Sequence, residues 1–114
     1  ASVIVKITYG TTSFLLTGDS PSEVEQFLVK TYGDQLRSDV LKLGHHGSKT
    51  SSSAEFLETV QPSIAIVSAG LGNKYGHPHE EVVERVGEIN AEILETAQIG
   101  TINCYSDGIT VFCD

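Results

Sequence analysis

The sequence predicts an α/β fold in which a mixed β-sheet carries helices on one face. Two observations predict it. Short apolar segments with the two-residue period of strands alternate with segments that have the period and start signals of helices. The expected order is β-β-α-β-α-β-α-β-β-β, and such alternation indicates parallel strands joined by right-handed crossovers. At 114 residues the chain is expected to form a single domain, residues 1–114.

The overall charge limits the classes of partner. Seven basic residues against 15 acidic ones give a net charge of −8, which argues against a broad electrostatic contact with nucleic acid. Bound cations can reverse the field of an acidic site, so a metal-centred phosphodiesterase is compatible with this charge. No apolar run approaches the roughly 20 residues that span a bilayer, so no membrane segment is expected.

Two strands are expected at the start of the chain. Residues 2–9 alternate apolar and polar side chains, and Gly10–Thr12 is expected to turn the chain back. Residues 13–17 are more apolar and are predicted to form a central strand that ends at Gly18 and Asp19. Because the first residues already have a strand pattern, the chain is expected to be a fragment of a longer protein or a short natural protein.

A helix is predicted to follow, since its start signals are strong. Ser20 can cap it, Pro21 suits the first helical position, and Glu23 can close a capping box. Gly33 is a plausible stop. The apolar stripe is expected to consist of Val24, Phe27, Leu28 and Tyr32.

The middle of the chain predicts strand, helix and strand again. Residues 39–43 form an apolar strand that runs into adjacent histidines, and Ser52–Glu55 has the pattern of a second capping box. This opens a short helix that Pro62 closes, with Phe56, Leu57 and Val60 on one face. Residues 63–69 are almost continuously apolar, which is typical of a strand covered on both faces.

The last third of the chain predicts a helix, a short strand and a hairpin. The helix spans residues 80–89 with Val82, Val83 and Val86 inward, and the strand spans residues 91–96. Residues 101–105 and 109–113 are expected to pair around a two-residue Asp-Gly turn. In that register Cys104 and Cys113 lie diagonally, too far apart for easy bridging, so both are expected to be free thiols.

Polar residues follow the expected strand ends, where ligands gather in open α/β sheets. Asp19 follows one strand, His45 and His46 follow the next, and His77 and His79 flank Pro78 in the loop after the third. Aspartate and histidine are common metal ligands, which favours a metal site at this edge. The alternatives are a turn or cap at Asp19, a solvated loop at the double histidine, and a helix-entry position for His79, which we favour for that residue.

Two other chemistries are disfavoured. Ser48 lies beside a histidine, but it is not in a Gly-x-Ser-x-Gly elbow and no aspartate is placed to orient the imidazole. Gly70-Leu-Gly-Asn73 has the wrong spacing for a dinucleotide fingerprint. Neither a serine hydrolase nor a nucleotide-cofactor enzyme is therefore expected.

These segments together resemble the metallo-β-lactamase fold superfamily. The likeness is greatest to the soluble domain of ComEC-type DNA-uptake proteins and their stand-alone hydrolase relatives. It runs in order through most of the chain. The segments that carry it are Thr17-Gly-Asp19, His45-His-Gly-Ser48 and Asn73-Lys-Tyr-Gly-His-Pro-His79.

The resemblance implies a site with two metals, zinc or manganese, that serve hydrolysis. It implies that Asp19 is a bridging ligand and His77 a second ligand, with His79 as second choice. His45, His46 and Ser48 would line the site as catalytic residues. Substrate would be contacted by Asn73 and Tyr75.

The superfamily's principal metal motif, His-x-His-x-Asp-His, is absent from this chain. The resemblance therefore implies the C-terminal half of an αβ/βα sandwich, inactive alone, whose uncovered sheet face would associate with the missing N-terminal half or with a second copy. DNA or another phosphoester is the implied substrate. A ComEC-type protein would place the chain outside the cytoplasm of a bacterium, and a stand-alone relative inside it. The second hypothesis is a non-catalytic module that binds itself or a partner.

Overall fold

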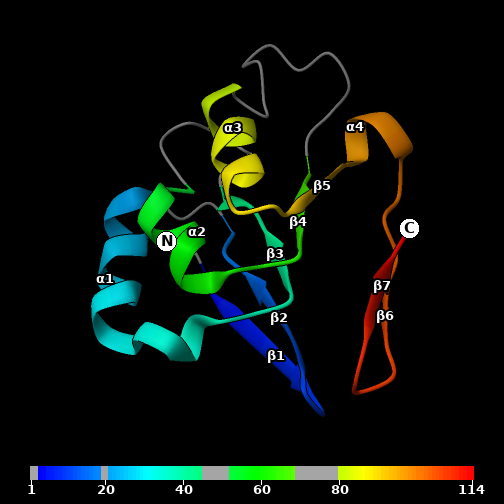
Figure 1. Ribbon diagram of the computed structural model, residues 1–114, viewed down its shortest axis with the longest axis horizontal. Helices are drawn as coiled ribbons and strands as arrows, with labels where there is room; N and C mark the ends of the chain where they lie inside the picture. The colour runs from blue at the N-terminus through cyan, green and yellow to red at the C-terminus, as the bar shows by residue number, and fades with distance from the viewer. Residues whose placement is uncertain (1–2, 19–20, 45–51, 69–79) are drawn as a thin grey trace.

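A five-stranded mixed sheet forms the centre of the computed structural model, which describes residues 3–18, 21–44, 52–68 and 80–114. Its strands lie in the order β1-β2-β3-β4-β5 (Figure 1). β1 pairs with β2 in antiparallel orientation, and the following three pairings are parallel. The strands are β1 (Val5–Tyr9), β2 (Thr12–Leu16), β3 (Val40–Lys42), β4 (Ile64–Val67) and β5 (Glu92–Glu95).

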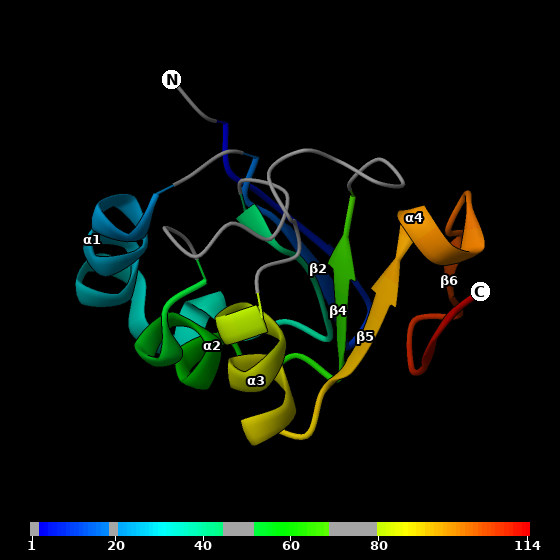
Figure 2. The same ribbon diagram turned by 90° about the horizontal axis from the view of Figure 1, so that it is seen from above.

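Three helices cover one face of this sheet (Figures 1 and 2). They are α1 (Ser22–Tyr32), which continues into the 3-10 helix η1 (Gly33–Leu36), α2 (Ala54–Val60) and α3 (Glu80–Glu88). This arrangement confirms the α/β class and the mixed sheet with helices on one face. It also adds two elements that the sequence did not predict, η1 and the short helix α4 (Thr96–Ile99).

The hydrophobic core lies between the three helices and the sheet. Strand residues that alternate toward the helices are almost fully buried, among them Leu15, Leu41 and Ala65. The helices contribute Leu28, Phe56, Leu57, Val60, Val82 and Val86 to the same cluster. Burial of this apolar surface is the main stabilising contribution.

Helix α1 is turned away from its predicted orientation. Leu28 is buried as expected, but Phe27 is 62% exposed and Tyr32 47% exposed. The start also differs, since Pro21 is the N-cap and makes no side-chain cap bond. The predicted cap, Ser20, lies outside the described residues.

The other two helices follow their predictions more closely. Ser53, rather than Ser52, caps α2, and its side chain accepts a hydrogen bond from the Phe56 amide at 3.2 Å. In α3, Val82 and Val86 are buried, whereas Val83 is 38% exposed because it lies at the margin of the helix face.

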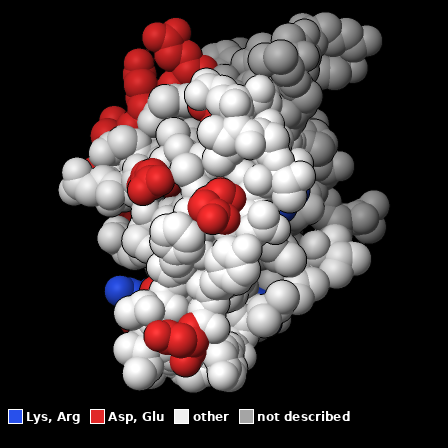
Figure 3. Space-filling view, turned by 90° about the vertical axis from the view of Figure 1, so that its right-hand side faces the viewer, with Lys and Arg blue, Asp and Glu red and all other residues white. Residues whose placement is uncertain are grey.

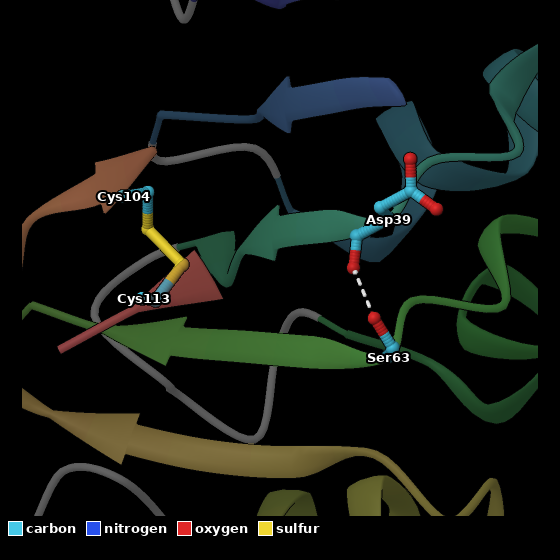
Figure 4. Close-up of a disulfide and its surroundings, with 4 residues drawn as sticks. All are labelled: Asp39, Ser63, Cys104 and Cys113. Atoms are coloured by element: carbon cyan, nitrogen blue, oxygen red, sulfur yellow. Dashed lines mark hydrogen bonds between the residues drawn. A yellow bond between two sulfur atoms is a disulfide. The ribbon is translucent and has the colours of Figure 1, made fainter. Parts of the chain in front are cut away.

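The β6–β7 hairpin, formed by Cys104–Ser106 and Val111–Cys113, lies on the other side of the sheet from α1–α3 (Figure 1). Cys104 faces Cys113 directly, and the two are joined by a disulfide with a Cα–Cα distance of 4.1 Å (Figure 4). The prediction of free thiols was wrong.

The physical reason for the error is the length of the turn. The Asp107 carboxylate accepts hydrogen bonds from the amides of Ile109 and Thr110 at 2.8 and 2.7 Å, which closes a four-residue turn between Ser106 and Val111. The longer turn changes the register and places Cys104 directly opposite Cys113. Next to them, the backbones of Asn103 and Asp114 exchange two hydrogen bonds. The same two amide bonds lower the pKa of Asp107 below its usual range.

The hairpin tip is held against the turn between β1 and β2. The Gly108 carbonyl accepts a hydrogen bond from the Thr11 amide at 2.7 Å, and the hydroxyls of Thr12 and Ser106 lie 2.6 Å apart. Gly10 has a φ of +60°, and a Cβ there would collide with the Gly108 backbone. Glycine at position 10 thus permits the close approach of the hairpin.

Candidate functional site

Strands β2, β3 and β4 end at the same edge of the sheet. They are parallel, and their ends are nearly in register: the last residues of β2 and β3, Leu16 and Lys42, are opposite each other, and Lys42 is opposite Ile66, the residue before the end of β4. The carboxyl edge of a parallel sheet is where ligand sites of α/β proteins form.

Hydrogen bonds connect the three strand ends. The buried Thr17 hydroxyl donates to the Lys42 carbonyl at 2.9 Å, and the Leu43 amide donates to the Ile66 carbonyl at 2.9 Å. Gly18, with a φ of +59°, ends the described part of the chain after β2. The starting points of the three following segments are therefore fixed relative to one another.

All eight predicted site residues lie in those following segments, outside the described residues. They are Asp19, His45, His46, Ser48, Asn73, Tyr75, His77 and His79. The structure describes the strands that lead to them and leaves their own positions untested. Within residues 3–18, 21–44, 52–68 and 80–114 no group of three or more His, Cys, Asp or Glu side chains could hold a metal ion. All four histidines lie in the segments just named, so the metal site stays a prediction.

Glu25 is a buried carboxylate next to this edge that sequence reasoning missed. It lies on α1 with no exposed surface, and its two oxygens accept hydrogen bonds from the amides of Ser52 and Ser53, at 2.6 and 3.0 Å. Ser52 is the first described residue after the double-histidine segment. Glu25 therefore anchors Ser52 and Ser53, which directly precede α2, to helix α1.

Arg85 on α3 completes this group. Its guanidinium donates to the Ser52 carbonyl at 3.3 Å and pairs with Glu81 at 3.4 Å. Burial raises the pKa of Glu25 above its ordinary value of about 4.5, while the amides of Ser52 and Ser53 and the charge of Arg85 oppose that rise. Three elements thus meet at Ser52, which has a φ of +57°.

The amide contact of Glu25 also explains the misassigned cap. In a capping box, Glu55 would reach back to the Ser52 amide. Here Glu25, from another helix, occupies that amide, and Glu55 is exposed. The available signal was a glutamate one turn before Leu28, on the inward side of α1, which the predicted stripe did not include.

The face of the sheet opposite the helices is apolar and partly uncovered. Strand alternation and register place one set of side chains on it, which we call the open face: Val5, Ile7, Tyr9, Thr12, Phe14, Leu16, Val40, Lys42, Ile64, Ile66, Glu92 and Leu94. The prediction that β4 is covered on both faces was wrong, because Ala65 and Val67 are buried while Ile64 and Ile66 are only half-buried. The apolar run does form a strand, but among the described residues only its helix-facing side is fully buried.

A cavity of about 500 Å³ lies between the open face and the segment that leads into the hairpin. Its floor includes Phe14, Leu16, Lys42 and Ile66, and Thr96, Ile102 and Cys104 close one side. Seen from the hairpin side, the described surface is mostly uncharged with separate acidic clusters (Figure 3). On the opposite margin, the Ser63 hydroxyl donates to the Asp39 carbonyl at 3.1 Å, which joins the starts of β3 and β4 (Figure 4).

The architecture is thus an α/β layer with one covered and one open sheet face. No protein-family model matches the chain. It is 41% identical over 102 residues to ComE operon protein 3 of Bacillus subtilis, which is 90% of this chain and 13% of that protein. It is 43% identical over 101 residues to competence protein ComA of Neisseria gonorrhoeae, covering 89% of this chain and 15% of the relative.

A third relative is recombination protein 2 of Haemophilus influenzae, with 38% identity over 112 residues, 96% of this chain and 14% of that protein. The chain therefore spans about one seventh of the length of these relatives. It is related to a segment of competence-related proteins. No helix in the described ranges is long and apolar enough to cross a membrane.

Proposed function

We propose that this chain is the C-terminal half of a metal-dependent hydrolase, with the metallo-β-lactamase fold, that cleaves phosphodiesters in DNA. One observation carries the proposal. Three parallel strands end together at one edge, and the chain continues from them directly into Asp19, His45-His46 and the Asn73–His79 segment. Polar residues that follow neighbouring parallel strands converge on one site.

The names of the relatives support the substrate class. ComE operon protein 3, competence protein ComA and recombination protein 2 are named for competence and recombination. We connect these names with DNA as the phosphodiester. The net charge of −8 implies that cations or additional polypeptide supply the positive field that a polyanion needs.

The donor set suits zinc or manganese, since it combines a carboxylate with imidazoles. Asp19 and His77 would hold the metal, with His79 as the alternative ligand. When bound, two such ions would supply a water nucleophile at neutral pH and stabilise the charge of the phosphate. His45, His46 and Ser48 would contact the scissile phosphate, and Asn73 and Tyr75 the rest of the substrate.

The open face supports the view that the active enzyme contains a second half. Asp19 and His77 provide too few ligands for a dinuclear centre, and an apolar sheet face that is only partly covered favours association. We infer that an N-terminal half completes both the sheet packing and the ligand set. The isolated chain is then inactive.

Reconstitution tests this function. The N-terminal half, added as a separate polypeptide, should restore hydrolysis of bis-p-nitrophenyl phosphate and of DNA in the presence of Mn²⁺ or Zn²⁺, and EDTA should abolish it. Asp19→Asn and His77→Ala should each lower the rate by more than about 100-fold because a ligand is lost. Lys30→Ala, on the exposed side of α1, is the matched control and should retain the rate. A folded complex that hydrolyses no phosphodiester with any divalent ion would contradict the proposal.

The open face also favours a second candidate, a non-catalytic module that assembles through this surface. Metal content separates the two. If the assembled wild type holds no metal above background, and His77→Ala behaves like the wild type in metal content and stability, the assembly module is the better description. Stoichiometric zinc or manganese that His77→Ala removes would favour the enzyme.

A further inference from the structure

Lys42 is a cation on the open face, at the carboxyl end of the middle strand. It ends β3, the middle strand of the sheet, and its register neighbours on either side are Leu16 and Ile66. Its side chain lines the 500 Å³ cavity together with Phe14 and Val40. An ammonium group therefore lies on a face whose other side chains on β2, β3 and β4 are apolar apart from Thr12, whose hydroxyl is paired with that of Ser106.

No carboxylate among the described residues pairs with the Lys42 ammonium. The ion pair found within the described ranges joins Arg85 and Glu81, both on α3. The acidic residue that shares the open face is Glu92, on β5, two strands away. Two strand spacings amount to about 10 Å, beyond ion-pair distance. Lys6 differs, since its ammonium donates to the carbonyls of Gln35 and Arg37 at 2.5 and 2.9 Å.

Covering the open face would take the Lys42 ammonium out of water. A buried charge without a partner is strongly unfavourable, so a surface that packs here must bring a compensating group. A carboxylate is the group that compensates an ammonium, and the rest of the covering surface must be apolar to match Ile7, Phe14 and Ile66.

Two occupants could bring that carboxylate. A second copy that packed its own open face here would have to place Glu92 over Lys42, and it would add another −8 to a chain that is already acidic. The relatives, by contrast, contain about seven times as much polypeptide as this chain. The charge balance and this additional length favour a different segment of a longer protein.

We propose that the open face receives a second apolar β-sheet layer, contributed by the remainder of the longer protein, which carries a carboxylate directly opposite Lys42. The proposal rests on the two-half domain of the proposed function and adds the chemistry by which the halves recognise each other. The ion pair fixes the register of one sheet on the other, because a shifted layer would bury both charges unpaired.

Carbodiimide cross-linking of the full-length protein that contains this chain tests the pairing. The reagent joins an amine to a carboxylate only when the two are in contact. A cross-link from Lys42 to an Asp or Glu outside residues 1–114, identified by mass spectrometry, is the expected result. A cross-link to Glu92 of a second copy would overturn the proposal, as would a cross-link of Lys42 to no carboxylate at all.

Substitution supplies an independent readout. In the full-length protein Lys42→Met should increase the open population, measured by pulse proteolysis, at least tenfold, since it leaves a buried carboxylate without its partner. The same change should not destabilise the isolated chain. Lys30→Met is the matched control and should be neutral in both. If Lys42→Met leaves the full-length protein unchanged or more stable, no carboxylate faces Lys42.

These results are separable from the hydrolase proposal. His77→Ala should abolish hydrolysis and leave the cross-link intact. A cross-link in a protein without hydrolytic activity would support the interface and contradict the hydrolase proposal. Hydrolysis without a cross-link would support the hydrolase proposal and contradict the carboxylate partner of Lys42.

Discussion

The two faces of the sheet have similar side chains but different surroundings. On the helix side, Leu15, Leu41 and Ala65 are at most 1% exposed. On the open face, in the same strands, Leu16 is 37% exposed and Ile7 50% exposed. The strands carry apolar side chains on both faces of the sheet. Helices α1–α3 bury one of these faces, whereas the hairpin and the segment before it cover only part of the other.

The largest expected effect separates the two faces directly. Leu41→Ala should lower the free energy of unfolding by about 2.7–5 kcal/mol, because it removes a buried side chain and leaves a cavity. Leu16→Ala is the matched control, and in the isolated chain it should cost well under half as much, since its side chain is already partly in water. Urea unfolding measures both. Equal losses would show that the open face is covered in solution.

Reduction tests the element that partly covers the open face. The disulfide closes a loop of about 10 residues, and its loss should cost about 2.7 kcal/mol through the entropy of the unfolded chain. Tris(2-carboxyethyl)phosphine should lower the thermal midpoint of the wild type. The Cys104→Ser/Cys113→Ser variant should match the reduced wild type and not respond to the reductant. Alkylation of both thiols in the untreated protein would refute the pairing.

Glu25 tests the helix-covered side. Glu25→Gln should cost about 2 kcal/mol, because a buried acceptor of the amides of Ser52 and Ser53 is lost. Glu23→Gln, exposed on the same helix, is the control and should be nearly neutral. Denaturant unfolding at neutral pH checks the difference. Equal effects of the two substitutions would argue that the contact contributes nothing.

The pH dependence of Glu25 has a definite sign. Its pKa is raised in the folded protein, so between about 4.5 and that raised value the native state binds more protons than the unfolded state. The contribution of this group to stability is therefore complete below that window and is lost as the pH rises through it. The stability of Glu25→Gln should fall less across the window than that of the wild type or of Glu23→Gln. A steeper fall in Glu25→Gln would show that the pKa is lowered.

The smallest effect concerns the surface of the open face. Ile7→Thr should change the stability of the isolated chain by less than about 0.5 kcal/mol, since Ile7 is half exposed on an edge strand. It should nevertheless reduce the fluorescence of bound 8-anilinonaphthalene-1-sulfonate, because an apolar group is removed from the cavity rim. A large loss of stability would mean that Ile7 is covered.

Much of the fold could be predicted because it depends on local patterns. Two-residue alternation identified β1 and β2, and start and stop signals located α1, α2 and α3 to within a few residues. The functional prediction rests on motifs at strand ends. For the site, the structure confirms the common edge from which the motif segments start and describes none of the eight residues themselves.

The errors had two sources, a long-range contact at Glu25 and a local turn at Asp107. Phe27 has the period of a core residue but lies outward, because the buried Glu25 turns α1 toward Ser52. The cysteine register depended on Asp107, whose carboxylate closes a longer turn than Asp-Gly alone suggests. The Glu25 contact joins residues 27 and 28 positions apart, whereas the Asp107 turn is local and its length was not evident from the Asp-Gly pair alone.

The sequence by itself determined the α/β class, the order of the strands and of helices α1, α2 and α3, and the positions of the polar motifs in the chain after the strands. These follow from short-range periodicity and turn chemistry, which each segment carries in its own residues. Only the tertiary structure decided which apolar face is covered, how Cys104 meets Cys113 and where Glu25 is buried. The covered face and the burial of Glu25 depend on contacts between segments that are distant in the chain, and their free energy arises only when the segments pack together. The cysteine pairing depends on the turn that Asp107 closes, whose length the sequence pattern did not reveal.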